Sequence, residues 1–188
     1  MDNAALFTTF PGYLGGPNPA AATDWTAAGG PTIGVNGTLA GMHDAFGPTD
    51  NSAATTWGFL QGVGTSYSQT ITLSANTNYD FSFLAGNRFS DMDATGRVTI
   101  ADNATTFYDS TSTNWGNTVF QLVNAQFMTG AMISGDVVLT LSNTSPAGDN
   151  TVNYSNLILT AVPEPNSFSL FFLGGIGILM RRRKSSQG

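Results

Sequence analysis

The sequence predicts an all-β protein: a jelly-roll-like antiparallel β-sandwich followed by one C-terminal hydrophobic helix. Three observations predict this fold class. Apolar and polar residues alternate along several short segments, as in strands that bury one face. Gly, Asn, Asp or Pro bounds each of these segments, and such residues favour turns. No segment before Ser167 has a helical period with capping residues, which disfavours α/β folds.

The expected strands follow one another at short intervals. Residues 1–56 are rich in turn signals such as G-G-P at Gly29, and they predict loops with one or two short strands. In residues 79–83, Tyr79, Phe81 and Phe83 share one face of a strand. Other strands are expected at 57–61, 67–73, 97–101, 105–108, 118–123, 136–142 and 151–160. Eight or so short strands at this spacing are typical of a sandwich.

The composition limits the classes of function. The chain has 188 residues and no cysteine, which suits one domain plus a tail and excludes disulfides and thiol nucleophiles. Residues 1–162 hold two arginines against eleven aspartates, a net charge of −9. Because such a body repels phosphate backbones, we expect no nucleic-acid partner.

The character of the chain changes at Ala161. Val162 and Glu164 each precede a proline, so V-P-E-P is expected to be extended. Residues 167–180 then form an uncharged apolar stretch of 14 residues. A helix of that length spans about 21 Å, less than the hydrocarbon core of a bilayer, about 30 Å. The stretch ends at the basic residues Arg181, Arg182, Arg183 and Lys184.

Two interpretations of residues 167–180 compete. Their length alone favours a buried core helix. Three glycines and the adjacent basic run favour a membrane segment instead, and arginine side chains can lengthen its effective span. We therefore expect an anchor, with the basic run in the cytoplasm and the acidic body outside.

The order of V-P-E-P at 162–165, the glycine-containing apolar stretch and the arginine cluster resembles the PEP-CTERM sorting signal of exopolysaccharide-producing bacteria. The resemblance implies an exosortase, a membrane transpeptidase, as partner, with cleavage at or near Pro163-Glu164-Pro165. We therefore expect an exported protein, anchored with its ectodomain outside and then placed at the cell surface or in the extracellular matrix.

Proteins of this kind carry an N-terminal secretion signal. M-D-N-A-A-L-F-T-T-F has neither a basic region nor an apolar core of sufficient length. Either the start is trimmed or wrongly assigned, or the chain is tail-anchored from the cytosol. The second alternative would carry four basic residues across the membrane, which is unfavourable.

Over about residues 57–160, the body is similar to the galactose-binding-like jelly-roll domains that are common among PEP-CTERM proteins and related carbohydrate-binding modules. The matching pieces include T-N-Y-D-F-S-F-L-A-G-N-R, G-R-V-T-I and D-N-T-V-N-Y-S-N-L-I-L-T. The resemblance implies that the body binds carbohydrate, with exopolysaccharide as a partner. We expect an ectodomain at residues 1–161, the sorting signal at 162–184 and a short tail at 185–188.

Three aromatic side chains are candidate glycan contacts: Trp115, Tyr108 and Trp25. Their flat faces can stack on sugar rings, and the loop-like context T-N-W-G-N favours exposure of Trp115. Core packing is the competing interpretation for each ring, and Trp57, at the start of a strand, is expected in the core.

Calcium is the one cofactor that the sequence predicts. From Asp91 to Asp102 the chain has oxygen-bearing residues at loop positions 1, 3, 5 and 12, with Gly96 at position 6. The predicted ligands are Asp91, Asp93, Thr95 and Asp102. The alternative is a polar hairpin turn closed by Gly96.

We expect no enzymatic activity. His43 is the only histidine, and no G-x-S-x-G nucleophile motif accompanies it. The single glutamate, Glu164, lies in the sorting motif. The leading prediction is an exported surface or matrix protein with a carbohydrate-binding body. Its alternatives are a purely structural matrix or adhesion protein and a secreted hydrolase, which would need two close aspartates in a cleft.

Overall fold

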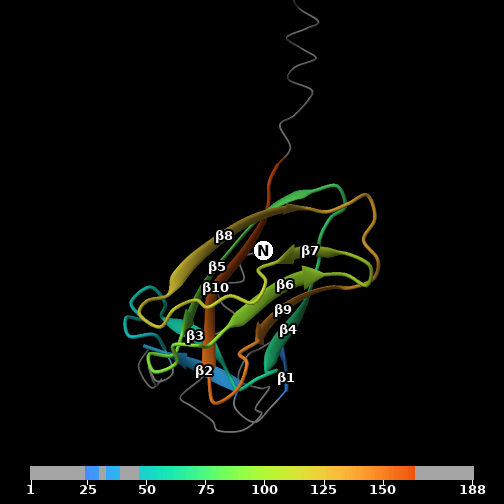
Figure 1. Ribbon diagram of the computed structural model, residues 1–188. Helices are drawn as coiled ribbons and strands as arrows, with labels where there is room; N and C mark the ends of the chain where they lie inside the picture. Colours follow the sequence, from blue (N-terminus) through green and yellow to red (C-terminus); the bar gives the residue numbers. More distant parts are fainter. Residues whose placement is uncertain (1–23, 30–32, 39–46, 164–188) are drawn as a thin grey trace, which may run out of the picture.

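A computed structural model describes residues 24–29, 33–38 and 47–163, and this part of the chain is all β (Figure 1). The expected all-β fold class is confirmed. The strands are β1 (Thr26–Ala28), β2 (Ile33–Gly37), β3 (Thr56–Gln61), β4 (Ser66–Ile71), β5 (Asn78–Asn87), β6 (Gly96–Ala101), β7 (Thr106–Asp109), β8 (Gln121–Met128), β9 (Val137–Asn143) and β10 (Thr151–Ala161).

The strands form two antiparallel sheets that pack face to face. One sheet has the order β1-β4-β9-β6-β7 and the other the order β2-β3-β10-β5-β8. Their inner faces enclose an aromatic core in which Phe83 meets Trp115 edge-on at 5.7 Å and Tyr79 stacks on Phe127 at 5.4 Å. Such contacts add to the free energy of burying the rings. The two sheets therefore form a sandwich around one main core.

Most expected strands agree with the observed ones within a few residues, but the strand expected at 118–123 is displaced. β8 begins at Gln121 and runs to Met128. Thr118 and Val119 instead pair with the segment before β3: the amide of Asp50 donates to the carbonyl of Thr118 at 2.6 Å, and Asp50 and Val119 form a β-bridge. Phe120 is buried. The apolar residues of this stretch therefore belong partly to a loop.

Gly96 is the first residue of β6. It therefore does not close a hairpin turn, which was the alternative to a calcium loop. A Cβ atom at this position would collide with the hydroxyl of Tyr154. Burial raises the pKa of this tyrosine, whose hydroxyl donates to the carbonyl of Ser142 at 2.9 Å. Glycine is required here by the close approach of a buried side chain.

β10 lies inside its sheet, between β3 and β5, and carries the chain to the sorting signal (Figure 1). Val162 follows its last residue, and the amide of Val162 donates to the carbonyl of Asn78 at 2.8 Å. Pro163 has no N–H group. The hydrogen-bonded ladder therefore ends inside the V-P-E-P motif.

The helix predicted at 167–180 lies outside the described residues, as do Glu164, Pro165 and the basic run 181–184. In the part of the chain that the structure describes, no helix has the length and hydropathy needed to cross a membrane.

Candidate functional site

The outer face of the β2-β3-β10-β5-β8 sheet, directed away from the other sheet, has two different halves. One half carries a second apolar cluster, in which Trp57 and Phe59 are fully buried. Phe120 packs against Trp57 with ring centroids 5.6 Å apart. The cluster, which we call the covered half, consists of Ala54, Trp57, Phe59, Leu84 and Phe120.

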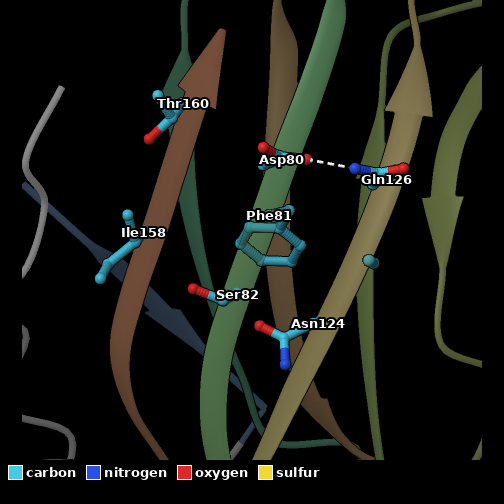
Figure 2. A pocket seen from close by; sticks show the side chains of 8 residues that line it. Asp80, Phe81, Ser82, Asn124, Gln126, Ile158 and Thr160 are labelled. Carbon is cyan, nitrogen blue, oxygen red and sulfur yellow. Dashed lines mark hydrogen bonds between the residues drawn. The ribbon is translucent and has the colours of Figure 1, made fainter. Parts of the chain in front are cut away.

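The other half of this face is open and hollowed into a groove of about 480 Å³. Figure 2 shows that β10, β5 and β8 each contribute side chains to it. We call it the open groove, and its lining residues are Asp80, Phe81, Ser82, Asn124, Ala125, Gln126, Ile158 and Thr160.

Strand alternation explains why polar side chains line the open groove. Tyr79, Phe81 and Phe83 point into the core, so the residues between them on β5 face outward. The register then sets two rows across the three strands. Ser82 lies between Asn124 of β8 and Ile158 of β10, and Asp80 lies between Gln126 and Thr160.

A bulge in β10 gives Ile158 its outward direction. Ser155 pairs with Leu84, and Ile158 pairs with Ser82. Between these two pairs β10 therefore contains one residue more than β5. Asn156 takes the left-handed conformation, φ 49°, which asparagine adopts more readily than most residues. The extra residue exchanges the two faces of the strand, so that Leu157 enters the core.

The open groove offers hydrogen-bonding side chains that make few contacts with the rest of the described structure. Nε2 of Gln126 donates to Oδ1 of Asp80 at 2.7 Å, drawn as the dashed line in Figure 2. The side chains of Ser82, Asn124 and Thr160 make no hydrogen bond to another described residue. Hydroxyl and amide groups both donate and accept. Asp80 is the one charged residue of the lining.

The groove continues toward the sorting signal as a second hollow of about 520 Å³. Asp80 and Gln126 belong to both hollows. The second hollow adds Asn78, Met128 and Val162 from the end of the sheet. Over the described residues, the two hollows together reach from Ile158 to Val162, the first residue of the V-P-E-P motif.

The structure corrects the expected exposure of two of the three candidate aromatic contacts. Trp115 follows a loop but is only 5% exposed, because its ring packs edge-on against Phe83 in the core. Trp25 is 4% exposed and packs against Tyr67. Neither offers a free face for a sugar. Trp57 is in the second cluster and fully buried, as expected of a core residue.

Tyr108, the third aromatic candidate, is half-buried on β7, in the other sheet from the open groove. Its ring meets Phe81 edge-on at 5.4 Å. Burial, together with the neighbouring charge of Asp109, raises the pKa of its hydroxyl. The three candidate rings therefore do not form one binding surface.

The four residues of the predicted calcium loop do not come together in the structure, because strand β6 separates Asp102 from the other three. β6 occupies Gly96–Ala101, and six residues of strand extend over about 20 Å. Thr95 and Asp102 thus lie at opposite ends of β6. Oδ2 of Asp91 accepts a hydrogen bond from the amide of Thr151 at 2.7 Å, whereas the Asp93 carboxylate accepts none from the described residues. No group of three or more His, Cys, Asp or Glu side chains among the described residues converges as a metal site would require.

Asp102 has a structural role instead. Its Oδ2 accepts from the amide of Ser134 at 2.7 Å, and its Oδ1 accepts from the amides of Ala104 and Thr105 at 2.8 and 2.6 Å. These N–H groups, that of Ser134 foremost, lower the pKa of Asp102, because they stabilise its charged form. The carboxylate ties the β6–β7 turn to the loop before β9.

Sequence patterns contained part of the signal for the open groove. Asp80 and Ser82 are the polar positions of Y-D-F-S-F, and alternation alone places them on the solvent face. Asn124 and Gln126 were not predicted to line a sheet face, because the expected strand ended at residue 123 whereas β8 runs to Met128. The outward direction of Ile158 depends on the bulge, for which the sequence has no clear signal.

Several solved structures have a fold similar to that of this body, at low sequence identity to it. The CBM22-1 xylan-binding domain of Xyn10C from Paenibacillus barcinonensis is 14% identical, with a TM-score of 0.52, 75% of this chain covered and 87% of that one. TmCBM61, solved with β-1,4-galactotriose, is 12% identical, with a TM-score of 0.50 and coverages of 74% and 90%. An apo cyclase from Fischerella sp. is 16% identical, with a TM-score of 0.54 and coverages of 77% and 86%.

These likenesses define the class of fold: a jelly-roll β-sandwich of the kind found in carbohydrate-binding modules. Residues 161–184 match the family model described as the PEP-CTERM protein-sorting motif. The chain therefore carries a PEP-CTERM signal behind a carbohydrate-binding-module-like sandwich, and this signal indicates an exported protein with a C-terminal membrane-anchoring segment. No curated protein has a significant match to the sequence.

Proposed function

We propose that the protein is a non-enzymatic component of the cell surface or extracellular matrix that holds a polysaccharide in the open groove. The observation that carries the proposal is the groove itself. It is a solvent-open hollow on a sheet face whose Ser82, Asn124 and Thr160 side chains have no hydrogen-bond partner among the described residues. Sugar hydroxyls are suitable partners, because they both donate and accept hydrogen bonds.

The charge of the groove favours an uncharged polysaccharide over an acidic one. Asp80 contributes a carboxylate to the lining, and no lining residue is basic. The body as a whole carries two arginines against eleven aspartates. Uronate or sulfate groups would be repelled both locally and by the net charge of the body.

Binding is favoured over hydrolysis because the groove supplies one carboxylate. Glycoside hydrolysis ordinarily requires two, about 5–10 Å apart across the scissile bond. Two structural neighbours, a xylan-binding domain and a module solved with bound galactotriose, support polysaccharide as the ligand class. The cyclase neighbour shares the fold, and fold alone does not fix chemistry.

The test is affinity electrophoresis of the full chain in detergent through gels that contain xylan, galactan or an acidic polysaccharide. We expect retardation by at least one uncharged polymer and none by the acidic one. The double substitution Ser82→Ala/Asn124→Ala should remove the retardation, because it deletes the central polar row of the groove.

A matched control uses two polar residues on the outer face of the other sheet. Thr99 and Thr140 pair across β6 and β9, and both are partly exposed. Thr99→Ala/Thr140→Ala should bind as the unchanged protein does. Equal loss of binding in both double variants, or no retardation by any uncharged polymer, would rule out the open groove as the binding site.

The sorting signal supports a second part of the proposal: an exosortase cleaves at or near Pro163-Glu164-Pro165 and transfers the body to a surface acceptor. The experiment is expression in an exosortase-positive host, followed by mass spectrometry of the C-terminus of the surface protein. We expect a C-terminus at or near residues 163–165. Surface protein that still contains residues 181–184 would contradict cleavage.

A further inference from the structure

The free edge of β8 is unlike the other sheet edges of the molecule. β8 ends its sheet and pairs only with β5 among the described strands. Its eight residues, Q-L-V-N-A-Q-F-M, are mostly exposed, with Leu122 at 63% and Met128 at 65%. A strand at a sheet edge leaves a row of backbone N–H and C=O groups without partners. β8 is therefore a template for a further strand.

The other edges carry features that discourage pairing. β1 has three residues, and β2 is buried throughout. β7 has four residues, its pairing with β6 contains an irregularity, and its Asp109 forms an ion pair with Arg97. Short strands, bulges and charges are the usual protections of edges. β8 has no proline, glycine or charged residue, and its register along β5 is uninterrupted.

The hydrogen bonds beside β8 show which of its backbone groups face outward. The amide of Thr129 donates to the carbonyl of Thr77 at 3.0 Å, one step beyond the pair Asn78–Met128. In an antiparallel ladder, the direction of these groups alternates along the strand. The backbone groups of Leu122, Asn124, Gln126 and Met128 therefore point to the free edge.

We propose that β8 pairs antiparallel with β8 of a second copy of this chain, about a two-fold axis at Ala125. The residue types on β8 are palindromic around this alanine. In this register Leu122 lies opposite Met128 of the second copy, and Asn124 lies opposite Gln126. On the inner side Val123 meets Phe127. Each apolar side chain thus meets an apolar one and each polar side chain a polar one, the pairing that stabilises adjacent strands.

Other registers lose this complementarity. Residues that lie opposite one another must share a face of the sheet, so the register can shift only by an even number of residues. A shift of two residues moves the two-fold axis from Ala125 to a neighbouring residue of β8. With the axis at Asn124 instead, Leu122 would face Gln126 of the second copy. With the axis at Gln126, Asn124 would face Met128. The pattern of the strand therefore selects Ala125 as the centre.

The dimer would join the open grooves of the two copies. Asn124 and Gln126 line the groove from β8, so the second copy continues the same outer face across the axis. A polysaccharide could then engage two grooves at once, which strengthens attachment without a new contact. The dimer itself does not depend on whether the groove binds sugar.

The first experiment uses the absence of cysteine from the chain. Ala125→Cys in the full chain, kept in detergent, places one thiol at the axis. Residues opposite one another in a non-hydrogen-bonded pair have Cα atoms about 4.5 Å apart, a distance that a disulfide spans. We expect a covalent dimer on non-reducing gels after mild oxidation.

Asn124→Cys is the matched control, because the two copies of residue 124 would lie diagonally, about 7–8 Å apart. We expect its disulfide to form about tenfold more slowly, since this spacing exceeds the usual range. Equal rates for both variants, or no covalent dimer with Ala125→Cys, would overturn the proposed register.

The second experiment tests the outer pairs by charge. Leu122→Lys/Met128→Lys places like charges opposite one another and should weaken the dimer about tenfold or more in sedimentation equilibrium. Leu122→Lys/Met128→Glu places lysine opposite glutamate and should restore it. A chain that is monomeric without any substitution, or a dimer indifferent to both variants, would overturn the proposal.

Discussion

The covered half and the open groove occupy the same sheet face, yet they have opposite characters. On β5, Leu84 is 7% exposed in the covered half, while Ser82, two residues earlier on the same face, lines the open groove. The difference comes from loops. Gly47 and Phe120, which lie in loops, close over Trp57, and no described segment closes over Ser82. Loops outside the sheet thus decide which part of a β face becomes core and which part remains available to a ligand.

The largest expected effect lies in the covered half. Trp57→Ala should lower the free energy of unfolding by about 3–5 kcal/mol, because it empties a fully buried aromatic site. Urea denaturation followed by circular dichroism measures this change. A loss below about 1 kcal/mol would mean that the cluster contributes little more than an ordinary surface residue, and the contrast between the two halves would then fail.

A smaller effect is expected where the loop meets the cluster. A Cβ atom at Gly47 would lie 2.9 Å from the ring of Trp57, so Gly47→Ala should cost about 1–3 kcal/mol through overpacking. Gly130→Ala is the control, since the added methyl there would touch no atom closer than 4.0 Å. Thermal unfolding of the two variants compares them. Equal melting temperatures would show that the loop does not press on Trp57.

The Asp102 carboxylate, which lies outside both halves of this face, should make the stability of the fold depend on pH. The pKa of Asp102 is lowered by backbone N–H donors in the fold, so its contribution is present above the unfolded pKa, about 3.9, and is lost as pH falls through the folded value. Asp102→Asn should therefore reduce the loss of stability between pH 4 and pH 2. Urea titrations at several pH values measure it, and an unchanged acid slope would contradict the assigned role.

The smallest effect on stability is expected in the open groove. Ser82→Ala/Asn124→Ala should change the free energy of unfolding by no more than about 0.5 kcal/mol, because the truncated groups have no protein partner among the described residues. The same denaturation assay measures it. A larger loss would indicate that these side chains support the fold, and loss of sugar retention could then no longer be assigned to the groove.

Sequence patterns predicted the class of fold because alternation is local. Y-D-F-S-F specifies which side chains of β5 face the core without any knowledge of the neighbouring strands. The C-terminal signal was equally accessible, since its three parts are contiguous in the chain. The pairing of β10 with both β3 and β5 could not be predicted from local patterns, because it joins residues that are distant in sequence.

The candidate site was harder to predict for the same reason. Trp115 has the local appearance of an exposed loop residue, and only the packing of Phe83 against its ring reveals that it is buried. The calcium spacing failed because the predicted loop positions after Gly96 are extended in β6. The open groove needs three strands in register and a bulge at Asn156, and none of these is a property of one segment.

The position of β10 has a mechanical consequence, because the hydrogen bond from Val162 to Asn78 continues this interior strand up to Val162. A pull on the chain beyond Val162 acts along β10, an interior strand bonded to β5 over most of its length and to β3 over its first residues. Ladder hydrogen bonds lie perpendicular to the strand, so this pull loads many of them in shear at once and does not open them one by one. Any anchor attached beyond Val162 would therefore pull on a strand that resists extraction.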